Sequence, residues 1–239
     1  MCERELLAGV DGVHLERREL LRLSFWGLAG LCVGGPRTLA ASSGMSTTWE
    51  GWIEEAHRRA ERIVQQSAAA EERYLIDLAA SLRRLDSGPD EDPERLRSRM
   101  GDVDFELLYR ERPVLALQFR MPPGASLPYH DHQHQNGVMK IVSGGLTLQS
   151  FEPVGEMPPR GETFLVEKTA DRRLGAGEVA FLGRQRDNIH GLTAGPGGAV
   201  VLDFFTNYRP EAHSNLLHIG EQARESERGR HPARIIGVL

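Results

Sequence analysis

A succession of short apolar segments, each ended by turn residues, most constrains the fold of this chain. Segments such as VLALQFRM, TFLVEKT and AVVLDFFT have the length and the branched-residue content of β-strands. The 239 residues include 26 glycines and 13 prolines, which punctuate these segments after about residue 113. Many short strands separated by such turns predict a β-sandwich or a β-barrel.

Composition narrows the classes of function. The chain carries 29 basic and 34 acidic residues, a net charge of −5, so no basic surface recommends a nucleic-acid partner. Both cysteines, Cys2 and Cys32, precede the predicted strands. If that region is removed, the remaining domain contains no disulfide, no thiolate ligand and no cysteine nucleophile.

Residues 1–45 have the features of a leader. Arg17 and Arg18 precede an apolar run, Leu23 to Val33, and then small residues. The run is shorter than the roughly 20 residues of a membrane-spanning helix, so no stable membrane span is expected. The order resembles a twin-arginine export signal and predicts a periplasmic or exported protein. The alternative is an amphipathic helix at the start of a cytoplasmic protein.

Residues 46–100 change to a helical period. Apolar residues recur at three- and four-residue steps, as at Trp49, Ile53 and Ala56, and a second amphipathic segment contains Leu75 and Leu78. Such a stripe is more often a packing face than a cofactor site. We therefore expect a helical arm that packs against the β domain.

Three histidines alternate in LPYHDHQHQNGVMKIVSGG, at His130, His132 and His134. Side chains two apart on an extended segment point to the same face, so His130 and His132 can meet one metal ion. His190 in NIHGLTA is a natural third ligand from a later strand. His134 shares the alternation, but the Gln-Asn-Gly after it is typical of a chain leaving a strand. This favours a place at the rim of the site.

Two segments carry a resemblance to a known family. MPPGASLPYHDHQHQNGVMKIVSGGLTLQSFEP and NIHGLTAGPGGAVVLDFFTNY resemble the cysteamine dioxygenase and plant cysteine oxidase family of thiol dioxygenases, which are single-domain cupins. The resemblance implies a mainly β protein with a cupin barrel, a double-stranded β-helix or jelly roll. We expect this barrel at residues 101–215, after the helical arm, with a C-terminal tail at residues 216–239.

The same resemblance implies a ligand set. Iron, as Fe²⁺, would be held by the three positions His130, His132 and His190, and Gly137 falls where most cupins place a glutamate ligand. Three neutral imidazoles leave the full charge of the metal to be met by an anionic substrate, such as a thiolate. The expected reaction adds O₂ to the sulfur of a cysteamine-like thiol or of an N-terminal cysteine peptide, giving a sulfinic acid.

Other residues are candidates around that ligand set. Asp203, Asn188 and Tyr208 could orient ligands or substrate, although an aspartate bonded to a loop, an asparagine in a turn and a packed tyrosine explain them as well. A free amino acid would require an arginine for its carboxylate, and the nearest in sequence are Arg110, Arg112 and Arg120.

Two further functions remain open at this point. One is a metal-dependent cupin oxygenase or isomerase acting on a non-thiol substrate, which Gly137 disfavours. The other is a non-catalytic cupin that binds a metal or a small ligand. The sequence provides no information on the oligomeric state.

Overall fold

The structure is a computed structural model that describes residues 48–66, 68–85, 88–89, 94–184, 186–221 and 229–239. The predicted leader at residues 1–45 lies outside these residues, so export stays a prediction. In the described part of the chain, no helix has both the length and the apolar character needed to cross a membrane.

Among the described residues, two helices precede the strands. Helix α2 spans Trp49–Ile63 and helix α3 spans Ala68–Arg84. In α2 the apolar stripe predicted from the sequence is buried, including Ile53 and Ala56, because these residues face the barrel. The helical part of the predicted arm ends at Arg84, and Arg97–Met100, which the prediction included in the arm, forms a strand.

In the part of the chain that the structure describes, ten strands form a single antiparallel sheet that closes on itself. Their bounds are β1 Arg97–Met100, β2 Val103–Glu111, β3 Val114–Met121, β4 Ser126–His130, β5 Gln135–Pro153, β6 Thr163–Gly175, β7 Val179–Leu182, β8 Ile189–Asn207, β9 Asn215–Ile219 and β10 Arg230–Val238. The order β8-β4-β9-β10-β6-β5 becomes a ring because β5 also pairs with β8. β1, β2 and β3 extend the sheet from β8, and β7 adds to β5. The predicted class, a mainly β cupin barrel with N-terminal helices, is therefore confirmed.

The sheet extends beyond the predicted domain boundary. Residues 216–239 were expected to be a tail, but they contain most of β9 and all of β10. β10 pairs with both β9 and β6, and its Ala233 and Ile235 are buried with Leu217. The apolar runs in these strands are too short to distinguish a strand from a tail until their pairing partners are known.

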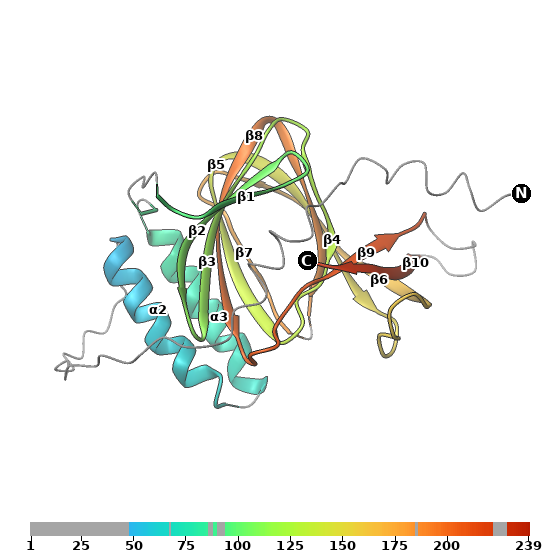
Figure 1. Cartoon of the computed structure of the whole chain (residues 1–239), viewed down its shortest axis with the longest axis horizontal. Helices are drawn as coiled ribbons and strands as arrows, with labels where there is room; N and C mark the ends of the chain where they lie inside the picture. Colours follow the sequence, from blue (N-terminus) through green and yellow to red (C-terminus); the bar gives the residue numbers. More distant parts are fainter. Residues whose placement is uncertain (1–47, 67, 86–87, 90–93, 185, 222–228) are drawn as a thin grey trace, which may run out of the picture.

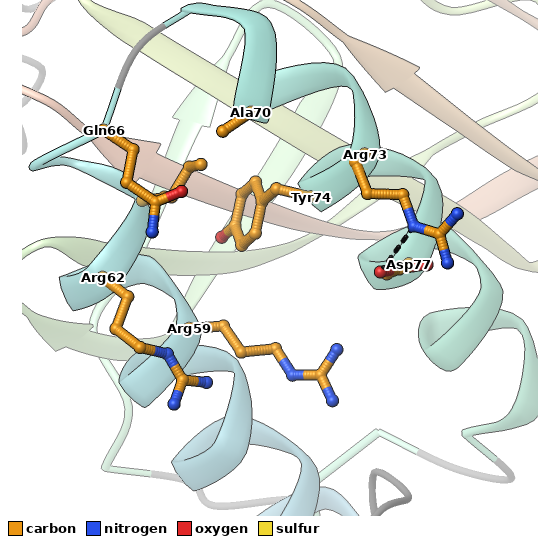
Figure 2. Close-up of a pocket in the computed structure, with 8 residues that line it drawn as sticks. Arg59, Arg62, Gln66, Ala70, Arg73, Tyr74 and Asp77 are labelled. Carbon is orange, nitrogen blue, oxygen red and sulfur yellow. Dashed lines mark hydrogen bonds and ion pairs between the residues drawn. The ribbon is translucent and has the colours of Figure 1, made fainter.

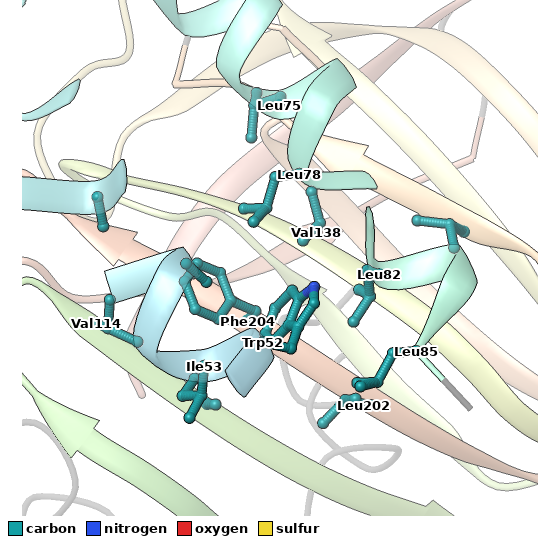
Figure 3. Packing of buried hydrophobic residues seen from close by; sticks show 14 of the residues in the cluster. Trp52, Ile53, Leu75, Leu78, Leu82, Leu85, Val114, Val138, Leu202 and Phe204 are labelled. Atoms are coloured by element: carbon teal, nitrogen blue, oxygen red, sulfur yellow. The ribbon is translucent and has the colours of Figure 1, made fainter. Parts of the chain in front are cut away.

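The helices cover one side of the barrel, opposite to the end formed by β6, β9 and β10 (Figure 1). Trp52 is fully buried and makes an edge contact with Phe204 of β8, at 5.2 Å between ring centroids. Leucines of α3, including Leu78 and Leu82, complete the same cluster (Figure 3). Removing a side chain as large as Trp52 from such a core costs about 3–5 kcal/mol. The arm is therefore an integral part of the domain.

Candidate metal centre

Three histidines meet inside the barrel. His130, the last residue of β4, lies directly across from His190 in the register of β4 and β8. His132 follows two residues after His130, just beyond the end of β4. The three rings are 3–5% exposed, and their metal-binding nitrogens lie within 4.8 Å of one another. The structure thus brings together the three histidines proposed from the sequence.

Each ring is oriented by a neutral acceptor. The Nδ1 atom of His130 lies 2.8 Å from the carbonyl oxygen of Pro128, and that of His190 lies 3.3 Å from the carbonyl oxygen of Asn188. The Nδ1 atom of His132 lies 3.0 Å from Oε1 of Gln135. Because these oxygens accept, each Nδ1 carries the proton and each Nε2 keeps a free lone pair.

The cluster is uncharged. Burial lowers the pKa of His132 to about 3, and it lowers the pKa values of His130 and His190, the latter well below its ordinary value. Nε2 of His132 is buried and has no hydrogen-bond partner. A buried polar atom normally has one, so this orphaned nitrogen fits a metal ligand. Neutral imidazoles suit iron, zinc, copper or nickel.

The segment that carries His132 is held from two sides. Asp131 is fully buried, and its carboxylate accepts bonds from the backbone N and from Nδ2 of Asn215, at 2.7 and 3.0 Å. Asn188 binds the backbone of His132 twice: its Oδ1 accepts from N at 2.6 Å, and its Nδ2 donates to O at 3.1 Å. Asp131 and Asn188 therefore fix the backbone from which His132 projects.

Gly137 has no room for a side chain. A Cβ atom there would lie 2.9 Å from the carbonyl oxygen of Phe204 and 2.9 Å from the ring of Phe205. The same Phe205 ring lies 4.9 Å from the ring of His132. An aromatic ring from β8 thus occupies the space beside Gly137. By the sequence resemblance, this is the position at which most cupins have a glutamate ligand.

Asp203 is a buried carboxyl on the inner face of β8. Its neighbours Leu202 and Phe204 face the helices, whereas Val201 and Phe205 face the barrel interior, so the alternation of the strand places Asp203 inside. Its Oδ1 has no hydrogen-bond partner, and burial raises the pKa of the carboxyl to about 8. A carboxyl with these properties can hold a proton near neutral pH.

Two other candidates lie elsewhere. The hydroxyl of Tyr208 accepts a bond from Asn136 at 2.8 Å, and the guanidinium of Arg184 lies 3.8 Å above its ring. None of the described contacts of Tyr208 reaches His130, His132 or His190, although its backbone N donates to the carbonyl oxygen of His134 at 2.8 Å. His134 has a left-handed backbone with φ of 60°, which ends the alternation, and it is absent from the histidine cluster.

A separate groove lies on the outer side of the arm, between α2 and α3 (Figure 2). Arginines line it, but Arg59 pairs with Glu55 at 2.7 Å and Arg73 pairs with Asp77 at 3.1 Å. Tyr74, also in its wall, directs its hydroxyl to Thr206 of β8 at 2.6 Å. The groove is thus distinct from the histidine cluster inside the barrel.

Sequence reasoning did not identify several residues of the site. Gln135 and Ser214 both lie within hydrogen-bond distance of Nδ1 of His132, at 3.0 and 3.1 Å. Phe205, which fills the space at Gly137, was also missed. Gln135 could have been suspected from its place three residues after a ligand, but no local pattern indicated Ser214, which lies 82 residues away.

A buried cluster of three neutral histidines in a closed antiparallel barrel defines a metal-binding cupin. A sequence model of the PCO_ADO family, that of cysteamine dioxygenases and plant cysteine oxidases, matches residues 74–215. This is more than half of the chain, so the protein belongs to the PCO_ADO family. Membership implies thiol dioxygenase activity, and members of the family are non-haem iron enzymes.

Similarity to other known proteins is weaker. No curated protein sequence matched. Among solved structures, the Cnp3 cupin domain of Schizosaccharomyces pombe is 16% identical with a TM-score of 0.36, over 48% of this chain and 70% of that chain. An RmlC-like cupin from Shewanella frigidimarina is 16% identical, with a TM-score of 0.38, over 49% and 87% of the two chains. KdgF from Halomonas sp. is 18% identical, with a TM-score of 0.37, over 52% and 96%.

Proposed function

We propose that this protein is an iron(II)-dependent dioxygenase that converts a small aminothiol, or the N-terminal cysteine of a peptide, into a sulfinic acid. The reaction consumes one O₂ per thiol and places both oxygen atoms on sulfur, so no other reductant is needed. The observation that carries the proposal is the ligand set. Three buried imidazoles are neutral, and a ring rather than a carboxylate lies beside Gly137.

The protein groups have distinct roles in this proposal. His130, His132 and His190 would hold Fe²⁺ through their Nε2 atoms, and the iron would supply a Lewis-acidic centre that binds both the sulfur and O₂. The neutral ligands add no negative charge, which favours an anionic thiolate as the substrate. The Phe205 ring against His132 excludes water from that side. Asp203 holds a proton at its buried carboxyl and exchanges it with the reacting groups.

The exposure of nearby arginines supports an aminothiol over a free amino acid. A free amino acid brings a carboxylate, for which a buried arginine would be the usual partner. Arg110, Arg112 and Arg120 are all exposed, so they do not line the buried site. Arg184 is already paired with Glu71 at 3.0 Å.

The decisive experiment is O₂ uptake by protein loaded anaerobically with Fe²⁺. Cysteamine, cysteine, 3-mercaptopropionate and a peptide with an N-terminal cysteine would be compared, with the product identified by a mass gain of two oxygen atoms. We expect uptake with cysteamine or the peptide, and none with iron-loaded His190→Ala. Tight metal binding without O₂ uptake for any thiol would instead support a non-catalytic cupin.

A further inference from the structure

Glu71 is a buried carboxylate on the helical arm, well removed in sequence from the histidines. It is 6% exposed, on the face of α3 that packs on the barrel. Oε1 accepts from the backbone N of Arg184 at 2.9 Å and from Nδ2 of Asn136 at 3.1 Å. Oε2 accepts from Nε of Arg184 at 3.0 Å. A carboxylate with three donors, one of them cationic, is a strong anchor for the groups that it binds.

Arg184 belongs to the connection between β7 and β8. Its backbone oxygen accepts a bond from Nδ2 of Asn188 at 3.0 Å. Glu71 therefore fixes both the backbone and the side chain of the residue that holds Asn188. The Arg184 guanidinium also lies 3.8 Å above the Tyr208 ring, which restricts it further.

Asn188 transmits this anchoring to two ligands. Its side chain makes both backbone bonds to His132, and its carbonyl oxygen lies 3.3 Å from Nδ1 of His190. A second connection runs through β5, where Asn136, bound by Glu71, is adjacent to Gln135, which orients the His132 ring. Both connections start at one carboxylate of the arm and end at the metal ligands.

We infer that Glu71 is a positioning residue of the metal centre, acting chiefly through Arg184 and Asn188. The arm then has a role besides covering apolar surface: it fixes the loop that orients His132 and His190. Partners beyond the first ligands typically change metal affinity by about 10- to 100-fold when they are removed. Because Glu71 acts two contacts further out than Asn188, through Arg184, we expect its effect near the lower end of that range.

The test is a Co²⁺ titration of the metal-free protein, followed by the visible absorption of bound cobalt and by competition with a chelator. Glu71→Gln keeps the shape of the side chain but places an amide NH₂ against the donors of Arg184 or Asn136. We expect about tenfold weaker Co²⁺ binding and a shifted cobalt absorption band. Asn188→Ala should weaken binding by about 10- to 100-fold.

Tyr74→Phe is the matched control. It removes another buried polar contact between α3 and the barrel, the 2.6 Å bond to Thr206, which leads to no ligand. We expect it to bind Co²⁺ within about twofold of wild type with an unchanged spectrum, even if its melting temperature falls as much as that of Glu71→Gln. Equal effects of the two variants on Co²⁺ affinity would overturn the inference.

A double variant tests the connection itself. If Glu71 acts through Asn188, Glu71→Gln should weaken Co²⁺ binding by no more than about threefold once Asn188→Ala is present. Independent, multiplying effects would refute the proposed connection. Should Glu71→Gln fail to fold, Arg184→Met removes the same ion pair from the other side. An unchanged Co²⁺ affinity in that variant would then count against the role of Glu71.

The inference rests on metal binding by the histidines, which the proposed function also assumes, but not on the substrate. If the wild-type protein binds neither Co²⁺ nor Fe²⁺, both this inference and the proposed function would be refuted. If wild type binds Co²⁺ normally and Glu71→Gln has the same Co²⁺ affinity, only the inference about Glu71 would be refuted.

Discussion

The sharpest prediction concerns Asp203, because its buried carboxyl should lower stability while supporting activity. Oδ1 of Asp203 has no hydrogen-bond partner, and burial raises the pKa of the Asp203 carboxyl in the folded protein from 3.8 to about 8. Asp203→Asn keeps the shape of the side chain and removes the ionisation. We expect the variant to be more stable than wild type at alkaline pH and to be much less active.

The magnitude follows from the pKa of Asp203. The folded state binds the proton more tightly than the unfolded state, so the wild type is penalised progressively as pH rises from 3.8 towards 8. At about 1.4 kcal/mol per pKa unit, the full penalty is about 5–6 kcal/mol. Between pH 5 and pH 8, wild type should lose about 4 kcal/mol of stability that Asp203→Asn retains. Loss of proton exchange should reduce O₂ uptake by about 100-fold or more.

The assay is urea unfolding of the metal-free proteins at several pH values, which isolates Asp203 because every other titrating group is shared. Asp131→Asn is the contrasting variant. Its carboxylate accepts three bonds, from Gln133 and twice from Asn215, so this change should destabilise by about 1–3 kcal/mol. If the stability of Asp203→Asn follows that of wild type across this pH range, the pKa of the Asp203 carboxyl is not raised in the folded protein.

Three further predictions concern the ligands and their surroundings. His190→Ala should abolish detectable Fe²⁺ binding in a titration, whereas His134→Ala should bind within about twofold of wild type; equal losses would contradict the ligand assignment. Gly137→Ala should lower the free energy of unfolding by about 1–3 kcal/mol, since the added Cβ meets backbone, whereas Gly197→Ala, with open space around it, should change it by less than about 0.5 kcal/mol. Burial lowers the pKa of His132 to about 3 in the folded protein. The contribution of His132 to the free energy of unfolding is therefore full above pH 6.5 and is lost as pH falls towards 3. In metal-free Asp203→Asn, which lacks the opposing titration of Asp203, acidifying from pH 6.5 to 5 should therefore cost about 2 kcal/mol from His132, and a melting temperature that rises over this range in that variant would contradict it.

Local patterns predicted much of this protein because periodicity directly determines which faces of its elements are buried. The apolar stripes predicted two helices, and the alternation of histidines predicted that His130 and His132 share one face. His134 lies outside the alternation, as expected, but the reason given for it was wrong, because the Gln-Asn-Gly after it begins strand β5. The boundary at residue 216 was not, because the short runs in β9 and β10 become strands only by pairing with distant partners.

Only the tertiary structure decided how the ligands are supported. Ser214 and Asn215 reach the His132 segment across more than 80 residues, and Glu71 reaches it from another element through Arg184. Such contacts depend on which strands close the barrel, a long-range property that no local window contains. The sequence alone therefore indicated two ligands of one metal site, because His130 and His132 are close in sequence, whereas strand pairing brings His190 to them. The fold decided its surroundings, because the ring that fills the space at Gly137 comes from a different strand.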